Sequence, residues 1–204
     1  MVQKDGKYIM HNYISKQVEN SINTKQKFFE DKELMSLLKT VSQQVVAAYK
    51  NGNKTLIAGN GGSAADAQHI AGEFVSKFYF DRPGLASLAL TTDTSILTAI
   101  GNDYGYERLF SRQLQANGVK DDVFIGISTS GNSKNIIEAL KECKGKGIVT
   151  VGFTGENGGA MKELCDYCLC VPSNETPRVQ ESHILLGHII CAVVEEEIFG
   201  KGFN

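Results

Sequence analysis

The nine residues TLIAGNGGS, at positions 55–63, join a short apolar run to a cluster of glycines. A short apolar run that ends in glycine is typical of a strand buried on both faces. Glycines after such a strand allow the backbone to approach a ligand closely. The small residues that follow predict a helix, whose free N–H groups and positive dipole end favour an anion such as phosphate. The stretch therefore predicts a strand, a phosphate-binding turn and a helix, in that order.

Similar apolar runs recur along the chain and alternate with segments of helical periodicity. Strands are predicted at residues 55–58, 86–90, 123–127, 148–153 and 167–171. Helices are predicted at residues 9–50, 63–78, 94–102, 106–115, 132–145, 159–164 and 177–199, the last with Thr176 as N-cap and Pro177 in its first turn. Such alternation implies a parallel sheet covered by helices on both sides. We predict a three-layer α/β/α sandwich with a five-stranded parallel sheet. Residues 1–204 would form one domain, with the helices at about 9–50 packing on it or on a neighbouring subunit.

The composition is typical of one globular cytoplasmic domain. The 204 residues are 42% hydrophobic and 22% charged, with a net charge of −2, which disfavours a disordered chain. No cluster of Lys and Arg with interleaved aromatic residues indicates a nucleic-acid partner. No apolar run is long enough to span a bilayer, and the first residues lack the apolar segment of a signal peptide. We therefore expect a cytoplasmic protein with neither a nucleic acid nor a membrane as partner.

The cysteines are interpreted as reduced thiols. Five cysteines, an odd number, occur in the chain, which is typical of a protein without disulfides. Cys165, Cys168 and Cys170 are close enough in sequence to suggest a metal clip, but no second pair matches them. Because the last two lie in a predicted strand, we favour buried core thiols over a zinc site.

A second loop of small residues follows the third predicted strand. Residues 128–133, STSGNS, carry hydroxyl groups and open a helix, as residues 59–63 do. Such residues also make ordinary turns and helix caps. Two of these loops at equivalent strand ends, where α/β sheets bind ligands, favour phosphate binding. Neither loop matches a P-loop or a dinucleotide motif, so a nucleotide cofactor is not indicated.

Two helices carry side chains suited to proton transfer or metal binding. His69 and Glu73 are four residues apart and share one face of the helix after the first loop. Alone, His69 is more often a structural imidazole and Glu73 is more often a solvated carboxylate. Their pairing on the helix after a phosphate-binding loop leaves the structural and the functional interpretations equally open. The last helix carries Gln180, His183 and His188 among apolar residues, which indicates burial in the core or at a subunit contact. A buried imidazole is either hydrogen-bonded in the core or functional, and spacing does not choose between His183 and His188.

At these residues the chain resembles the phosphoheptose isomerases, sedoheptulose 7-phosphate isomerases with the flavodoxin-like SIS (sugar isomerase) fold. The matching stretches are GNGGSAADAQH (59–69), Glu73, GNDYG (101–105), GISTSGNS (126–133) and RVQE (178–181) with His188. The glycine loop and the serine loop are marks of the SIS fold in general. Their combination with the histidines, Glu73 and Gln180 is more specific to the isomerases.

The resemblance implies roles for a substrate site that holds a sugar phosphate. The residues that would line the substrate site are Asn60, Gly61, Gly62, Ser63, Glu73 and Gln180. The residues that would hold the phosphate are Ser128, Thr129, Ser130 and Ser133. Asn102 and Asp103 would contact the sugar chain, although in isolation this pair is typical of a helix cap and turn.

The resemblance also implies a metal, catalytic residues and an assembly. One zinc ion per subunit would be bound by four residues: His69, Glu73, Gln180 and His188. Glu73 and His188 would also transfer protons. A homotetramer with active sites at subunit contacts is implied, and the apolar last helix suits such contacts.

The expected reaction interconverts sedoheptulose 7-phosphate and D-glycero-D-manno-heptose 7-phosphate through an enediol, for bacterial surface glycans. A carboxylate suits proton abstraction from carbon, an imidazole suits proton exchange with the oxygens, and zinc would act as a Lewis acid. A carboxylate bound to zinc is a poorer base, so the sequence leaves open whether Glu73 is base, ligand or both.

Other interpretations remain from the sequence. The chain could be a non-catalytic SIS module that senses a sugar phosphate or scaffolds a partner, an isomerase of another phosphosugar, or a structural oligomer. Gly72 departs from the expected Ala or Glu and costs about 1 kcal/mol relative to Ala in a helix, unless it allows closer helix packing. The extension to about Met10 has no counterpart and is assigned no role.

Overall fold

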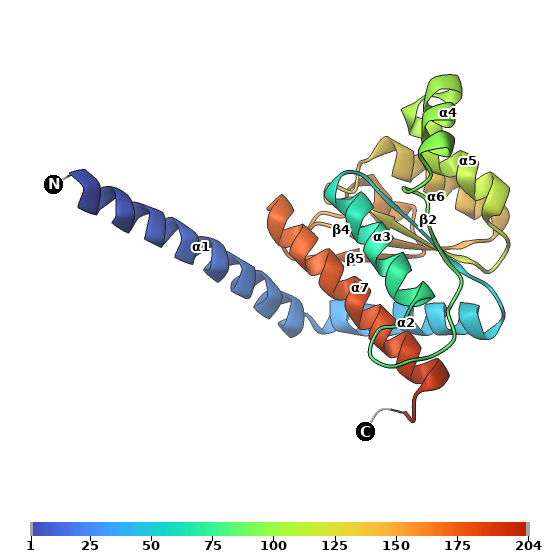
Figure 1. Ribbon diagram of the computed structural model, residues 1–204, viewed down its shortest axis with the longest axis horizontal. Helices are drawn as coiled ribbons and strands as arrows, with labels where there is room; N and C mark the ends of the chain where they lie inside the picture. Colours follow the sequence, from blue (N-terminus) through green and yellow to red (C-terminus); the bar gives the residue numbers. More distant parts are fainter. Residues whose placement is uncertain (1, 203–204) are drawn as a thin grey trace.

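The computed structural model describes residues 2–202, with the side chains of residues 10–202. Its centre is a sheet with helices around it (Figure 1). The five strands of the sheet are parallel and lie in the order β2-β1-β3-β4-β5. The strands are β1 (Thr55–Gly59), β2 (Ser87–Ala89), β3 (Val123–Ile127), β4 (Val149–Thr154) and β5 (Tyr167–Cys170). The predicted fold class, an α/β sandwich around five parallel strands, is therefore confirmed.

The helices form the two outer layers of the sandwich. They are α1 (Val2–Glu30), α2 (Lys32–Lys50), α3 (Gly62–Val75), α4 (Thr94–Tyr104), α5 (Leu109–Asn117), α6 (Lys134–Lys146) and α7 (Thr176–Phe199), with short 3₁₀ helices η1 (Tyr106–Arg108) and η2 (Gly159–Glu163). Buried side chains of α2, α3 and α7 form one core with one face of the sheet. Side chains of α5 and α6 form a second core with the other face. No helix within residues 2–202 is both long and apolar enough to cross a membrane.

The pairing of β1 with β3 positions the candidate site. These strands pair from Thr55 with Val123 to Gly59 with Ile127, so their following loops emerge side by side. The strand order reverses between the same two strands, because β1 pairs with β2 on its other edge. In open parallel sheets, ligands bind in the crevice beyond the carboxyl ends of the strands at such a reversal. The glycine loop and the serine loop therefore flank this crevice.

Helix α1 projects away from the sandwich and reaches it only through its second half (Figure 1). Ser21 donates a hydrogen bond to the carboxylate of Glu181 on α7 at 2.7 Å, and Arg178 donates to the carbonyl of Gln17. Nonpolar side chains lie exposed along the projecting helix, including Met10, Tyr13, Ile14, Val18 and Ile22. A long helix with so many exposed nonpolar side chains is typical of a helix that packs against another element.

Several element boundaries differ from the predictions. The predicted segment 9–50 is two helices, because Asp31 caps α2 through the backbone N–H of Leu34. Helix α3 ends at Val75 instead of residue 78, since the backbone turns at Ser76. The N-cap of α7 is Glu175, one residue before the predicted Thr176, and it makes no side-chain capping bond. Such shifts are ordinary at helix ends.

Candidate active site

The first turn of α3 is built by the glycine loop. Gly61 has a φ of +56°, a conformation that favours glycine, and it precedes the helix. A Cβ on Gly59 would lie 2.5 Å from the backbone oxygen of Ser63, so the strand turns tightly into the helix. No side chain caps this helix start. Its backbone N–H groups are therefore suited to an anionic or polar ligand.

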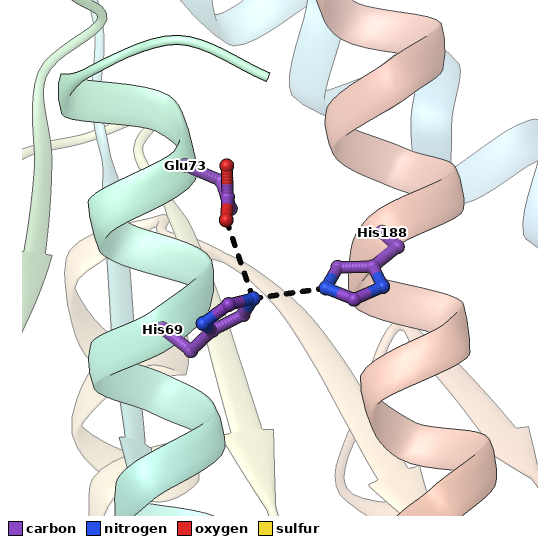
Figure 2. Close-up of side chains that lie close together, drawn as sticks. All are labelled: His69, Glu73 and His188. Carbon is purple, nitrogen blue, oxygen red and sulfur yellow. Dashed lines mark hydrogen bonds and ion pairs between the residues drawn. The ribbon is translucent and has the colours of Figure 1, made fainter. Parts of the chain in front are cut away.

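The central feature of the site is a cluster of His69, Glu73 and His188 (Figure 2). His69 and Glu73 extend from successive turns of α3, and His188 extends toward them from the neighbouring α7. The His69 Nε2 atom lies 2.9 Å from the His188 Nε2 atom and 3.3 Å from the Glu73 Oε1 atom. The side chain of His69 is 48% exposed and that of Glu73 is 23% exposed. The cluster therefore lies at the surface, where a small molecule can reach it.

The cluster has the chemistry and size of a zinc site. Tetrahedral bonds of about 2.0–2.1 Å place neighbouring ligand atoms roughly 3.3 Å apart. One nitrogen or oxygen atom from each of the three residues lies within 4.8 Å of the others. Two imidazoles and one carboxylate form a donor set that zinc accepts. Among the residues that the structure describes, no other group of three His, Cys, Asp or Glu side chains lies this close together.

Gln180, the fourth expected ligand, lies on α7, and its side chain reaches the beginning of α3. A Cβ on Gly62 would be 2.6 Å from the Gln180 Nε2 atom, so the amide rests on this glycine. The structure thus gathers three of the four expected ligands and places the fourth two turns before His188 on the same helix. The role of Gln180 as a ligand stays a prediction.

The structure separates the two histidines that spacing left open. His183 is fully buried, and its Nε2 atom lies 3.1 Å from the carbonyl oxygen of Thr154. Burial lowers the pKa of His183 to about 4, although the bond to Thr154 acts in the opposite direction. His183 is therefore a neutral imidazole of the core, and its Nε2–H donates to Thr154. His188 is the histidine that joins the cluster.

The serine loop after β3 gathers hydroxyl groups. The Oγ atom of Ser128 lies 2.8 Å from that of Ser133 and 3.4 Å from that of Ser130. Thr129 and Ser130 also line a cavity of about 260 Å³ with residues after β4 and β5. A hydroxyl group can donate to a phosphate oxygen as readily as to another hydroxyl. The arrangement is therefore suited to phosphate, and the phosphate role of these four residues stays a prediction.

Gly131 allows the serine loop to pack on the loop after β4. Its φ is +66°, and an added Cβ would lie 2.0 Å from the carbonyl oxygen of Gly158. The Met161 N–H also donates to the Gly131 carbonyl at 3.1 Å. Neither loop can move independently while these contacts are kept.

Asn60 is held by two residues that the sequence analysis did not single out. Its side-chain amide exchanges two hydrogen bonds with Asn135, at 2.8 and 2.9 Å, and its Oδ1 atom accepts a third from Tyr106 at 3.0 Å. Asn60, Gly61 and Tyr106 line a cavity of about 340 Å³ beneath α4. Asn135 and Tyr106 are far from Asn60 in sequence, so no local pattern could have indicated them.

The remaining predicted residues occupy different surroundings. Ser63 is buried in the first turns of α3, whereas Asn102 and Asp103 are exposed at the end of α4, where the Asn102 amide donates to the Asp103 carboxylate at 2.8 Å. The structure does not bring this pair into the cluster.

Asp66, three residues before His69, was not among the site residues predicted from the sequence. Burial raises the pKa of Asp66 while His69 acts to lower it, and its Oδ2 atom has no hydrogen-bond partner.

The cysteines are free thiols. Cys143 and Cys191 are buried, whereas Cys165, Cys168 and Cys170 are only half-buried, in contrast to the expected core position. A hydrogen bond with Cys165, followed by burial, raises the pKa of Cys168 to about 11. The interpretation that these residues form no zinc site stays a prediction.

Comparisons with known proteins agree with this fold. The SIS domain family matches residues 18–155. Phosphoheptose isomerase 2 of Campylobacter jejuni is 69% identical over 195 residues, covering 96% of this chain and 97% of that protein. The phosphoheptose isomerase of Aneurinibacillus thermoaerophilus is 69% identical over 194 residues, covering 95% and 98%. The solved phosphoheptose isomerase GmhA from Neisseria gonorrhoeae superposes with a TM-score of 0.86 at 40% identity, covering 92% of this chain and 99% of that one.

Proposed function

Because this chain belongs to the phosphoheptose isomerases, aldose–ketose isomerases with the SIS fold, we propose that the His69, Glu73 and His188 cluster is its catalytic centre. The reaction interconverts sedoheptulose 7-phosphate and D-glycero-D-manno-heptose 7-phosphate, a precursor for bacterial surface glycans. One observation carries the assignment to this cluster. Two imidazoles and a carboxylate lie within 4.8 Å of one another, two of these groups on α3, the helix that the glycine loop begins, and the third on α7.

Glu73 and His188 are assigned the two proton transfers. The Glu73 carboxylate takes a proton from C1 or C2 of the sugar, this proton exchanges with solvent, and the protonated Glu73 donates a proton to the neighbouring carbon. The His188 imidazole moves the second proton between the two oxygens. Glu73 Oε1 lies 3.3 Å from the His69 Nε2 atom, and the ring of Phe78 lies 5.6 Å from that of His188. Both contacts support these assignments, since they restrict the reacting side chains.

We assign one zinc ion per subunit to His69, Glu73 and His188, with Gln180 as the fourth ligand. When bound, zinc supplies a Lewis acid that favours negative charge on the sugar oxygens. The two roles of Glu73 compete, because a carboxylate that binds a cation is a weaker base. Loss of the Glu73 carboxylate is therefore expected to lower both zinc affinity and turnover.

The serine loop is assigned to the phosphate of the substrate. Its hydroxyl groups and the N–H groups at the start of α6 are donors on one side of the crevice. The phosphate is distant from the reacting carbons, so binding there orients the sugar. Asn60 and its neighbours in the glycine loop, with Asn102 and Asp103, are assigned to the sugar chain.

A second copy of this chain is proposed to complete the site, in a homotetramer. A groove of about 780 Å³ lies between α2 and α7 and is lined by Met35, Leu38, Val46, Ile189 and Val193, among others. A second groove of about 630 Å³ shares the last two residues and reaches His188. Nonpolar grooves of this size, with the exposed apolar side chains of α1, are typical of subunit contacts. Because His188 lines one of them, a neighbouring subunit would form part of the wall of the site.

We also propose that the enzyme acts in the cytoplasm, because its charged phosphosugar substrate does not cross a bilayer unaided. Nucleic acid and membrane are not proposed as partners.

The test is conversion of sedoheptulose 7-phosphate by the purified protein, followed by chromatography and accompanied by zinc analysis. The wild-type protein is expected to form the aldose heptose phosphate, and Glu73→Gln and His188→Ala are expected to lose at least 100-fold in turnover. Glu163→Gln is the control, because this exposed glutamate ends η2 away from the cluster. No conversion by zinc-loaded wild type that still binds the sugar phosphate would contradict the proposal and favour a non-catalytic sensor or scaffold.

A further inference from the structure

A buried arginine closes the end of the helix that carries Glu73. Arg82 lies in the segment between α3 and β2, and its side chain is 2% exposed. Its guanidinium group donates to the carbonyl oxygens of Glu73 at 2.8 Å, Phe74 at 2.6 Å and Ser76 at 3.1 Å. Carbonyls in the last turn of a helix have no partner within the helix, and a cation there also interacts favourably with the dipole. Arg82 thus fixes the turn of α3 from which Glu73 extends.

A buried glutamate of α7 binds the segment between α3 and β2 through hydrogen bonds. Glu195 is 1% exposed, and its carboxylate accepts hydrogen bonds from the backbone N–H groups of Phe78 at 2.7 Å, Tyr79 at 2.7 Å and Phe80 at 3.2 Å. It also forms an ion pair with the Arg82 Nε atom at 3.4 Å. Burial raises the pKa of Glu195, but these N–H groups outweigh it and the net pKa lies below the ordinary value. The carboxylate is therefore charged at neutral pH.

The Arg82–Glu195 pair connects α3 and α7, the two helices that carry the cluster of His69, Glu73 and His188. Glu195 follows His188 by seven residues, or two turns, so both side chains lie on the face of α7 toward α3. The helices are in close contact at the level of the cluster, where a Cβ on Gly187 would be 2.5 Å from the Ile70 side chain. Phe78 donates its N–H to Glu195 and places its ring 5.6 Å from the ring of His188. One buried pair is therefore connected to both sides of the cluster.

We propose that Arg82 and Glu195 are positioning residues, which hold α3 against α7 so that His69, Glu73 and His188 keep the spacing that a metal ion requires. Neither side chain forms a hydrogen bond with the imidazoles or the carboxylate of the cluster. Their action is through the Glu73 carbonyl and the segment of Phe78. The inference rests on the proposed metal centre, and it predicts an effect on metal affinity that a purely stabilising ion pair would not have.

The chain offers a matched control for this distinction. Lys54 and Asp122 form another buried pair, with the Asp122 carboxylate fully buried and 2.7 Å from the Lys54 Nζ atom. Asp122 also accepts backbone N–H bonds from Lys54 at 3.1 Å and Val119 at 2.9 Å. This pair precedes β1 and β3, at the end of the sheet opposite the glycine loop. Disruption of this pair is therefore expected to lower the free energy of unfolding without changing the positions of His69, Glu73 and His188.

The experiment measures the zinc dissociation constant of the full-length protein by competition with a chelator. Glu195→Gln and Arg82→Lys are expected to weaken zinc binding at least tenfold, as loss of groups that orient metal ligands commonly does, and Asp122→Asn is expected to leave it unchanged. The measurement is made at a temperature where circular dichroism shows each variant folded, and Arg82→Lys keeps the test valid if Glu195→Gln does not fold. Unchanged zinc affinity in the folded variants, or an equal loss in Asp122→Asn, overturns the inference.

A separate result distinguishes failure of the proposed metal centre from failure of the positioning role. If the wild-type protein binds no zinc, the metal assignment is wrong, and the positioning role is then decided by crystal structures of the metal-free proteins. The distance between the Nε2 atoms of His69 and His188 is expected to increase in Glu195→Gln relative to wild type. An unchanged distance overturns the positioning role as well.

Discussion

The neutral state of His183 predicts a specific dependence of stability on pH. His183 is fully buried on α7, and its pKa of about 4 lies below the value of 6.5 that the unfolded chain would have. The folded protein therefore binds fewer protons than the unfolded chain between these two pH values. Because protons then favour the unfolded chain, stability is lost as the pH falls through this window and is fully present above it.

The size of the effect follows from the two pKa values. One pKa unit corresponds to about 1.4 kcal/mol, so lowering the pH from 7 to 5 is expected to remove about 2 kcal/mol of the free energy of unfolding through His183 alone. His183→Gln provides the comparison, since its amide can donate the same bond to Thr154 but cannot be protonated in this range. Other groups titrate in both proteins, so the measured quantity is the difference between them.

Urea unfolding of both proteins at pH 7 and pH 5, at one protein concentration, tests this prediction. The wild type is expected to lose about 2 kcal/mol more than His183→Gln over this interval. A parallel loss in the two proteins would refute the conclusion that the core holds His183 neutral, and would reopen the possibility that it titrates as a functional imidazole.

Three further substitutions test separate parts of the structure. Gly72→Ala is expected to raise the free energy of unfolding by about 0.5–1 kcal/mol, because a Cβ there meets nothing within 4 Å; a loss of stability in urea unfolding would instead indicate that another subunit covers this side of α3. Gly131→Ala is expected to raise the KM for the sugar phosphate at least tenfold, because the added Cβ would collide with the Gly158 carbonyl and displace the serine loop; an unchanged KM in a steady-state assay would remove this loop from the phosphate site. Tyr106→Phe is expected to raise KM about threefold with a smaller change in kcat, since it removes one of three hydrogen bonds to Asn60; a loss confined to kcat would place Tyr106 in the chemistry.

Much of the fold could be predicted from local sequence. Each strand was located to within one or two residues, because buried parallel strands are short apolar runs bounded by glycine or polar residues. The break at Asp31 was missed, since helical periodicity continues across it and only the capping bond to Leu34 separates the two helices. Within the chain Gly72 does not allow closer helix packing, because a Cβ there would meet nothing within 4 Å.

The site was predictable where its residues share one element or one motif. His69 and Glu73 are four residues apart on one helix, so their proximity follows from helical geometry. The choice of His188 over His183 depends on burial against Thr154, which spacing does not determine. Asn135, Arg82 and Glu195 were not predicted, because no helix or strand pattern relates them to their partners. Asn135 is 75 positions from Asn60. Arg82 is 8 and 9 positions from the carbonyls that it binds at the end of α3, and Glu195 is 116 positions from Tyr79.

The measurement that tests the central claim most directly is the reaction of sedoheptulose 7-phosphate with the purified protein in D₂O, followed by NMR. An enediol formed by proton transfer to Glu73 predicts the aldose heptose phosphate with deuterium at C2, and no such product with Glu73→Gln. Conversion by Glu73→Gln at the wild-type rate, with deuterium at C2, would contradict the assigned proton transfer. No conversion at all by the zinc-loaded protein would contradict the isomerase itself.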